Sequence, residues 1–438
     1  MEIFDVLGVG FGPANIAVAV ANEELGTDLK IRFFEKNKTS AWQSGMQFGQ
    51  SDIQNHPLRD LVTPRNPRSK YSFTNFLHTK GRLFEFLNLG KTYALRSEYT
   101  QYIEWVAQHF SDSVSYETEV KSINYVRVND QPLYKLTTSE NTVFYGRSLI
   151  VAPGRTPYIP APFDKLSSPR IIHLTDFIPT LNKNKGKSLQ KVAVVGGSQS
   201  AIEILLHLSD TLPETAIYGF SRAFGYRMKD VSPFTGEVYF PKFVDTYYSS
   251  TSEQKRTLNK DLRFTNYSAT DADVLDALYL KMYQEKIEGR ERIFIVRSSN
   301  ILNADITETE KISLSYSSIE VPEVTKTDFD LIILATGFKN LGASEDEEKY
   351  PAILSDLVNF AETDHNGVLR INKDYSLPMK AENHLQAPCY LNGLCESSHG
   401  MGDAGSFSML SLRSAVIINS VAEQLANTSI QTRTLKVV

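Results

Sequence analysis

Cysteine is scarce in this chain of 438 residues, which contains only Cys389 and Cys395. So low a count excludes a disulfide framework and fits a reducing compartment. No apolar stretch approaches the length needed to span a bilayer, and the first apolar run begins at Ile3, which leaves no space for a secretory signal peptide. These absences predict a cytoplasmic protein with no membrane partner.

An excess of basic charge is also missing. The 46 Lys and Arg residues are outnumbered by 51 Asp and Glu residues, which gives a formal net charge of −5 at pH 7. Proteins that bind nucleic acid usually concentrate positive charge, so we expect no nucleic-acid partner. His399 and the two cysteines lack further ligands at a suitable spacing, so we expect no metal site either.

The chain does contain two strand–turn–helix signatures of dinucleotide binding. The first passes from an apolar run through Gly8, Gly10 and Gly12 into a helical pattern. Pro13 stands where such a turn usually carries its third glycine. Glu35 closes the next apolar run, at a position where an acidic residue can hold a ribose hydroxyl.

The second signature follows the apolar run at 192–195 and comprises Gly196, Gly197, Ser198, Gln199 and Ser200. Small residues at the start of a helix place free backbone N–H groups and the positive end of the helix dipole against a pyrophosphate. One such signature is weak evidence. Two of them predict two nucleotides that meet face to face.

The order of these segments predicts the domain organisation. The chain is too long for one ordinary core, so two or three domains are expected. We expect an α/β fold with two Rossmann-like domains and a small, mostly helical substrate region. The predicted divisions are the first part of an FAD domain at 1–164, an inserted NADPH domain at 165–325 with substrate contacts at about 230–290, and the second part of the FAD domain, with a C-terminal pocket loop and helix, at 326–438.

In this division the apolar strand at 329–335, which ends at Thr336 and Gly337, returns the chain to the first sheet. Several flavoprotein classes share such a layout. Flavin disulfide reductases need a redox pair of cysteines beside the flavin, and the two cysteines here lie near the C-terminus, away from both turns.

Baeyer–Villiger and flavin-containing monooxygenases share a motif before the second turn. Only His173 and Phe177 of that motif remain here, while Ser167 and Pro169 occupy two of its other positions. This class stays an alternative, and a flavin-binding protein without turnover is a more distant one.

A third class matches along nearly the whole length. The matching blocks are 8–15 with its proline, Trp42 with Gly45 and Met46, Gln54, 60–67, 71–73, 81–83, 266–268, 335–338, and His399-Gly400 with Asp403. In this order they resemble the microbial N-hydroxylating flavin monooxygenases, the ornithine and lysine hydroxylases of siderophore biosynthesis. Each block alone is weak, but the ordered set is specific.

The resemblance implies an FAD- and NADPH-dependent enzyme that hydroxylates a primary amine with O2, through a hydroperoxide at the flavin C4a position. The attacking amine must be neutral, and an alkylammonium with a pKa of about 10.4 leaves only about one molecule in a few thousand neutral at pH 7. Burial beside the flavin raises that fraction. The resemblance assigns Gln54 and Asn266 to catalysis and implies a homo-oligomer, either a dimer or a tetramer.

Arg222 follows the apolar run at 216–220, where a guanidinium can clamp the 2′-phosphate of NADPH. With the two turns and the family blocks, the expected cofactor contacts are Gly8, Gly10, Gly12, Pro13, Glu35, Trp42, Gln54, Gly196, Gly197, Ser198, Gln199, Ser200, Arg222, Asn266, Thr336, Gly337, Asp403 and Ser408.

The predicted substrate wall departs from the family pattern. Arg59 stands where the ornithine hydroxylases carry a lysine, and Gly236 where they carry an asparagine that holds the amino-acid head. An unpaired buried polar group costs about 1–3 kcal/mol. We therefore expect histamine as substrate, with L-ornithine or a diamine (putrescine or cadaverine) as alternatives. The expected substrate contacts are His56, Arg59, Gly236, Tyr239, Asn266, Phe407 and Ser408.

Overall fold

The computed structural model describes residues 2–49, 51–129, 131–186, 188–380, 387–404 and 406–435, with side chains as far as residue 427. Gly405 of the predicted pocket loop therefore lies outside the described residues.

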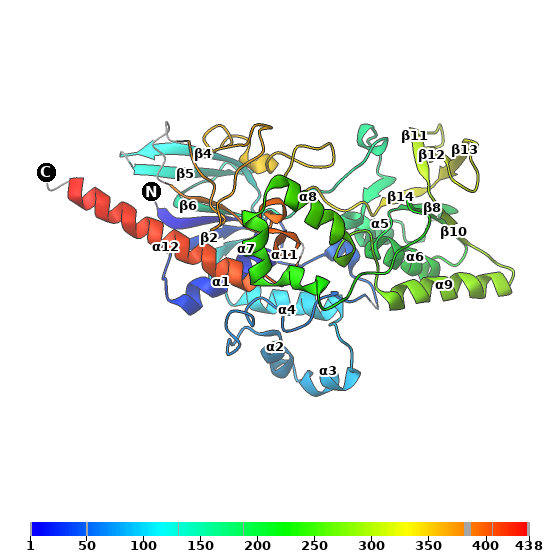
Figure 1. Cartoon of the computed structure of the whole chain (residues 1–438), viewed down its shortest axis with the longest axis horizontal. Helices are drawn as coiled ribbons and strands as arrows, with labels where there is room; N and C mark the ends of the chain where they lie inside the picture. The colour runs from blue at the N-terminus through cyan, green and yellow to red at the C-terminus, as the bar shows by residue number, and fades with distance from the viewer. Residues whose placement is uncertain are drawn as a thin grey trace.

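A seven-stranded sheet organises the first unit of the molecule (Figure 1). Its order is β3-β2-β1-β6-β5-β4, with β15 paired to β6. The central pairs of this sheet are parallel, and the carboxyl halves of β1 and β6 are buried apolar residues, as expected where both faces are covered. The strands are β1 (Ile3–Val9), β2 (Ile31–Phe34), β3 (Val114–Ser115), β4 (Val120–Val128), β5 (Gln131–Thr138), β6 (Val143–Val151) and β15 (Cys389–Leu391).

Helices from both ends of the chain cover this sheet. α1 and α12 pack against each other, and α4 contacts α1 (Figure 1). α2 and α3 lie beyond α4, and the short α10 and α11 precede α12. Their bounds are α1 (Pro13–Leu25), α2 (Phe73–Thr79), α3 (Leu83–Leu89), α4 (Arg96–Gln108), α10 (Glu396–His399), α11 (Met401–Ala404) and α12 (Leu410–Leu435).

A five-stranded parallel sheet in the order β10-β9-β8-β14-β7 organises the second unit. A three-stranded antiparallel sheet, β11-β12-β13, packs beside it. The strands are β7 (Ile171–His173), β8 (Lys191–Val195), β9 (Ala216–Phe220), β10 (Ile293–Val296), β11 (Asn300–Ile306), β12 (Ile312–Ser317), β13 (Thr325–Phe329) and β14 (Leu331–Leu334). The helices are α5 (Phe177–Lys183), α6 (Gln199–Thr211) and α9 (Ala272–Ile287).

Two helices, α7 (Pro241–Ser249) and α8 (Ser252–Asp261), lie between the two units in Figure 1. They follow β9 in the chain, and α7 contacts α10 of the first unit. The segment at 230–290 therefore contacts both units, because α9 at its end packs on α6. These observations confirm the predicted α/β fold with two strand–turn–helix units.

One prediction about the topology is wrong. The strand expected to return the chain to the first sheet is β14, and it lies in the second sheet between β8 and β7. An apolar run of this kind fits any fully buried parallel strand, so its composition could not identify the sheet. The return to the first sheet comes later, through β15.

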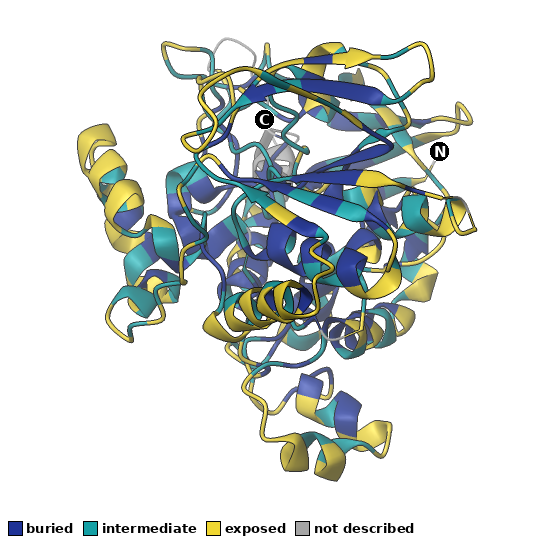
Figure 2. Ribbon diagram, turned by 90° about the vertical axis from the view of Figure 1, so that its right-hand side faces the viewer, coloured by how far each residue is buried: buried dark blue, intermediate teal, exposed yellow. Residues whose placement is uncertain are grey.

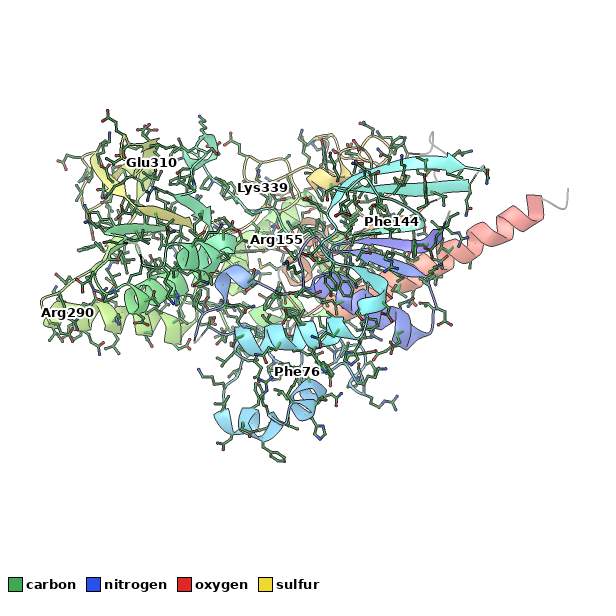
Figure 3. All side chains as sticks on the ribbon, turned by 180° about the vertical axis from the view of Figure 1, so that it is seen from behind. Phe76, Phe144, Arg155, Arg290, Glu310 and Lys339 are labelled. Carbon is green, nitrogen blue, oxygen red and sulfur yellow. The ribbon has the colours of Figure 1, made fainter. Side chains whose placement is uncertain are left out.

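Two crossovers join the units, and they run side by side. Tyr158 N–H donates to Gly337 O at 3.0 Å, and Lys339 N–H donates to Thr156 O at 2.8 Å. In Figure 3, Arg155 of the first crossover and Lys339 of the second lie near each other in the middle of the molecule, between Phe144 in the first unit and Arg290 in the second.

Figure 2 colours the residues by burial, and the buried apolar side chains of the described residues form three clusters, one in the first unit and two in the second. The strands of both sheets are largely buried, whereas the outer faces of the covering helices are exposed. Within the described part of the chain, no helix combines the length and apolar character required to traverse a bilayer.

Candidate active site

The first nucleotide turn is shaped by close backbone packing. Gly10 has φ of +80°, and a Cβ there would lie 2.2 Å from the carbonyl oxygen of Ala152. A Cβ on Gly12, in contrast, would meet no atom within 4 Å. Pro13 occupies the first turn of α1, where its missing N–H costs nothing. The helix therefore begins at an open, uncapped end that fits a phosphate.

Glu35 lies beside this turn, just after β2. Its Oε2 accepts a hydrogen bond from Phe11 N–H at 2.9 Å, and its Oε1 accepts from Asn37 N–H at 2.9 Å. The carboxylate is thereby fixed next to the glycines, where a ribose contact is expected.

The second turn also packs closely against a neighbouring strand end, in the second unit. A Cβ on Gly196 would lie 2.4 Å from Ala335 O, so the turn packs tightly against the end of β14, whereas a Cβ on Gly197 would have only the Ser221 hydroxyl nearby, at 3.4 Å. Ser198 precedes α6 without a side-chain cap. Arg222 is exposed just beyond β9, where it can meet a phosphate at this end of the sheet. Each turn therefore fits a dinucleotide.

The structure brings most of the predicted substrate wall together. Arg59 Nη1 donates to Ser408 Oγ at 3.4 Å, and the guanidinium lies 5.9 Å from the centre of the Tyr239 ring. Phe407 packs edge-on against Trp42, with ring centroids 5.1 Å apart. Residues from four distant segments thus form one wall with a cation and an apolar side.

Tyr239 connects this wall to Asn266. The Tyr239 hydroxyl donates to Thr265 O at 3.2 Å, and burial raises the pKa of Tyr239 to about 12, so the hydroxyl stays protonated. Asn266 is the next residue after Thr265 in the chain. Its backbone N–H donates to Arg263 O, and none of the described residues hydrogen-bonds its side-chain amide. That amide is available to a ligand.

A buried polar cluster supports the Asn266 loop from behind. The Tyr267 hydroxyl donates to Glu396 Oε2 at 2.5 Å, and Asn340 Nδ2 donates to Glu396 Oε1 at 3.0 Å. Arg155 in turn donates to Asn340 Oδ1 at 2.7 Å. Burial raises the pKa of Glu396, against the opposing effect of the Arg155 charge. The loop is therefore tied to both crossovers and to α10.

Gln54 adopts an uncommon backbone conformation, with φ of +50°. Its side chain donates from Nε2 to Asp271 Oδ2 at 2.5 Å. Left-handed backbone at a residue other than glycine is strained and is frequent at functional sites. Asp271 lies just before α9, so Gln54 of the first unit is held by the second.

Three residues predicted to contact the substrate or a cofactor lie outside this wall or already bind another residue of the chain. His56 is exposed, and its Nδ1 accepts a hydrogen bond from Leu58 N–H. A Cβ added to Gly236 would meet no atom within 4 Å, so this residue leaves open space. The Asp403 side chain is fully buried and pairs with Arg413 at 2.9 Å, so it stabilises α11.

Thr336 and Gly337 belong to the second crossover. Thr336 Oγ1 donates to Tyr158 O at 2.5 Å, and Gly337 O is 2.9 Å from His173 Nε2. Burial lowers the pKa of His173 and keeps it neutral. These residues hold the two crossovers together at the edge of the second turn.

Sequence reasoning missed the residues that support the site. Arg155, Asn340 and Glu396 lie in three distant segments, and each resembles an ordinary surface residue in the sequence. Two of them share a positional signal, because Arg155 and Asn340 each follow a strand and a glycine turn. The burial that makes them a cluster appears only in three dimensions.

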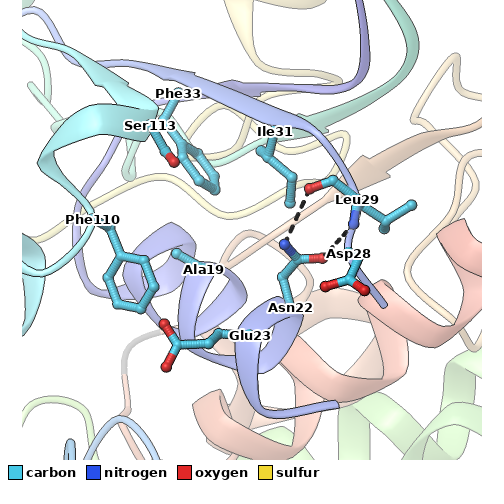
Figure 4. A pocket seen from close by; sticks show the side chains of 9 residues that line it. All are labelled: Ala19, Asn22, Glu23, Asp28, Leu29, Ile31, Phe33, Phe110 and Ser113. Carbon is cyan, nitrogen blue, oxygen red and sulfur yellow. Dashed lines mark hydrogen bonds between the residues drawn. The ribbon is translucent and has the colours of Figure 1, made fainter. Parts of the chain in front are cut away.

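A separate pocket of about 360 Å³ lies between α1 and β2 (Figure 4). Asn22, Glu23 and Phe110 are among its lining residues, and none of the predicted site residues lines it. The pocket is therefore not part of the candidate active site.

Comparisons with known proteins agree with this geometry. A family model described as L-lysine 6-monooxygenase/L-ornithine 5-monooxygenase matches residues 2–340. The L-ornithine N(5)-monooxygenase of Pseudomonas aeruginosa is 32% identical over 435 residues, which cover 97% of this chain and 94% of that protein.

Solved structures of ornithine hydroxylases are also similar to this chain. The reduced form of the ornithine hydroxylase from Pseudomonas aeruginosa superimposes with a TM-score of 0.88 at 32% identity, covering 97% of this chain and all of that one (100%). An ornithine N-hydroxylase of Kutzneria sp. 744, solved with reduced FAD, NADP+ and L-ornithine, gives a TM-score of 0.87 at 30% identity and covers 97% and 100%.

Proposed function

The chain belongs to the L-lysine 6-monooxygenase/L-ornithine 5-monooxygenase family of FAD- and NADPH-dependent N-monooxygenases, and from this premise we propose that it hydroxylates the terminal amine of L-ornithine. The relatives support ornithine over histamine, the substrate first expected from the sequence. We place this reaction in siderophore biosynthesis.

The observation that carries the proposal is the position of Arg59. Its guanidinium lies on the wall formed by Tyr239 and Ser408, and its contact with Ser408 is long, at 3.4 Å. A planar guanidinium suits a carboxylate, which it can bind through two hydrogen bonds. An ω-amino acid can therefore bind its carboxylate there and extend its side chain toward Asn266. Histamine and the diamines lack the carboxylate.

We propose that FAD binds at the first turn and NADPH at the second. Gly10, Gly12 and Glu35 then hold the FAD pyrophosphate and ribose, while Gly197 and Arg222 hold the NADPH phosphates. In this division the FAD domain consists of the first unit, and the NADPH domain consists of the second unit inserted into it.

When bound, the reduced flavin supplies the activation of dioxygen. The chain's own residues must deliver a neutral amine and keep water away. Trp42 and Phe407 provide an apolar wall that disfavours the charged ammonium. The amide oxygen of Asn266 accepts an N–H of the amine and fixes the direction of its lone pair, and Arg59 anchors the other end of the substrate.

A second candidate is favoured by Gly236. This glycine offers no side chain to the α-amino group of an amino acid, which favours a smaller amine such as histamine, putrescine or cadaverine. The two candidates differ in whether the substrate needs a carboxylate, so they can be separated directly.

The test is a substrate panel of L-ornithine, L-lysine, histamine, putrescine and cadaverine. The protein should purify yellow, oxidise NADPH and form the most hydroxylamine per NADPH with L-ornithine. Hydroxylamine must be measured, because peroxide release also consumes NADPH. Greater coupled product from histamine or a diamine supports the second candidate, and a colourless protein that leaves NADPH unchanged contradicts both.

A further inference from the structure

A buried ion pair links the two units beside the candidate site. Arg96 on α4 and Glu203 on α6 are 6% and 5% exposed, and Arg96 Nη2 lies 3.0 Å from Glu203 Oε2. The same guanidinium donates to Met46 O at 2.7 Å and to Asp52 O at 3.0 Å. Arg96 therefore holds two backbone segments of the first unit while it pairs with the second.

The segment around Met46 is itself part of the contact between the units. Met46 is 3% exposed and packs in the core of the second unit, in one cluster with Phe177 and Ile202. A Cβ on Gly45 would lie 2.0 Å from Thr175 O, so no side chain fits between the two units at that point. Apolar packing and the ion pair thus fix the same segment.

Gln199 extends the connection to the second nucleotide turn. Its Nε2 donates to Glu203 Oε1 at 3.0 Å, and its Oε1 accepts from Asp271 N–H at 2.9 Å. Both ends of this buried amide are occupied. Since Gln199 is the first residue of α6, any movement of the turn moves this amide and its two partners.

Asp271 closes the connection on Gln54. Its Oδ2 accepts from Gln54 Nε2 at 2.5 Å, and its Oδ1 lies 3.9 Å from Lys229 Nζ. Gln54 N–H donates to Asp52 Oδ1 at 3.0 Å, and Asp52 O is held by Arg96. A closed ring results, which we call the junction ring: Arg96, Glu203, Gln199, Asp271, Gln54 and Asp52.

The ring crosses between the units twice and contains one strained residue. Gln54 keeps its left-handed backbone only while its surroundings hold it. The Asp271 contact holds the side chain, and the Asp52 contact holds the backbone. Removal of the carboxylate of Glu203 or Asp271 breaks the junction ring. The second nucleotide turn and Gln54 are then held less firmly.

We infer that Glu203 and Asp271 are positioning residues for the hydroxylation. They act through Gln54 and Gln199, and they hold the second nucleotide turn and the wall of the active site in one fixed relation. Their effect is on coupling, the fraction of NADPH oxidation that yields hydroxylamine. The inference rests on the proposed function, since coupling has meaning only for an amine hydroxylase.

The test compares Glu203→Gln with Asp210→Asn, a matched control on the same helix. Asp210 forms an exposed ion pair with Lys281 of α9, entirely within the second unit. Glu203→Gln should lower hydroxylamine per NADPH by up to about 100-fold, the loss that a displacement of roughly 1 Å can cause. Peroxide should rise correspondingly, and the visible circular dichroism of the bound flavin should change. Asp210→Asn should match wild type.

A second pair of variants tests the other side of the ring. Asp271→Asn keeps a side-chain oxygen for Gln54 Nε2, whereas Asp271→Ala removes it. Coupling should therefore be retained better in Asp271→Asn than in Asp271→Ala. If Glu203→Gln does not fold, the comparison of Asp271→Asn with Asp271→Ala still tests whether the junction ring controls coupling. Wild-type coupling and wild-type flavin dichroism in both Glu203→Gln and Asp271→Ala would overturn the inference.

Hydrogen exchange separates this inference from the proposed function. In the FAD-free protein, amides of 44–49 and 51–56 should exchange faster in Glu203→Gln than in Asp210→Asn. If wild type forms no hydroxylamine from any amine, the proposed function fails, yet faster exchange still supports a ring that fixes this segment. Equal exchange in the two variants contradicts the ring whatever the substrate.

Discussion

At the scale of single residues, the predicted substrate contacts include one charged residue and one glycine that leaves open space. Arg59 provides a cation, and Gly236 provides only space, since a Cβ there would meet no atom within 4 Å. Gly236 also has an ordinary backbone conformation, because it is not among the glycines with positive φ. A side chain can therefore be added at this position without strain.

We predict that Gly236→Asn lowers the KM for L-ornithine by about tenfold, because one recovered hydrogen bond is worth roughly 1.4 kcal/mol. Gly236→Ala is the control, since it fills the same space without a polar group. Steady-state hydroxylamine formation measures both. An unchanged KM in a folded, yellow Gly236→Asn variant would contradict the proposed position of the amino-acid head.

Predictions of site residues from the sequence rest on local patterns. Gly10, Glu35 and Gly197 follow from a strand, a turn and a helix that are adjacent in the chain. Asp403 is predicted to contact a cofactor, and its carboxylate also pairs with Arg413, which the sequence does not predict. Such pairing depends on burial and on distant segments, which a local pattern does not contain.

At the scale of elements, the first turn and α1 illustrate two different uses of glycine. Gly10 is required by the fold, because its φ is +80° and its Cβ would clash with Ala152 O. Gly12 is not required by the fold, because its φ is −84° and its Cβ would face open space. The open space at Gly12 is where the phosphate is expected.

Two alanine variants therefore differ in a predictable way. Gly10→Ala should lower the free energy of unfolding of the FAD-free protein by about 2 kcal/mol or more, because the left-handed backbone disfavours a Cβ. Gly12→Ala should leave that free energy close to wild type and weaken FAD binding. Urea unfolding and flavin titration measure the two effects. Equal stability of the two FAD-free variants would contradict this assignment.

The prediction of elements succeeded for strand–turn–helix segments and failed for one connection. β1 with α1 and β8 with α6 lie where the sequence predicts them. β14 was assigned to the first sheet because it is an apolar strand followed by Thr336 and Gly337, but its partners are β8 and β7. Strand pairing depends on the whole topology, which hydrophobic pattern alone does not specify.

At the scale of the whole molecule, the candidate site lies where the two units meet. The first unit supplies Arg59 and Gln54, and the second supplies the nucleotide turn. The segment between β9 and α9 supplies Tyr239 and Asn266. Three features hold the two units in contact: the two crossovers, the Glu396 cluster and the junction ring. We therefore assign one reaction, the hydroxylation of an amine nitrogen, to the interface between two nucleotide sites.

The most direct test of this central claim is the fate of oxygen during turnover. The purified enzyme, loaded with FAD, is supplied with NADPH, L-ornithine and isotopically labelled dioxygen, and the product is examined by mass spectrometry. We predict a hydroxylamine on the terminal nitrogen that carries one labelled oxygen atom. NADPH oxidation that yields only labelled peroxide and unmodified amine, for every amine of the panel, would contradict the claim.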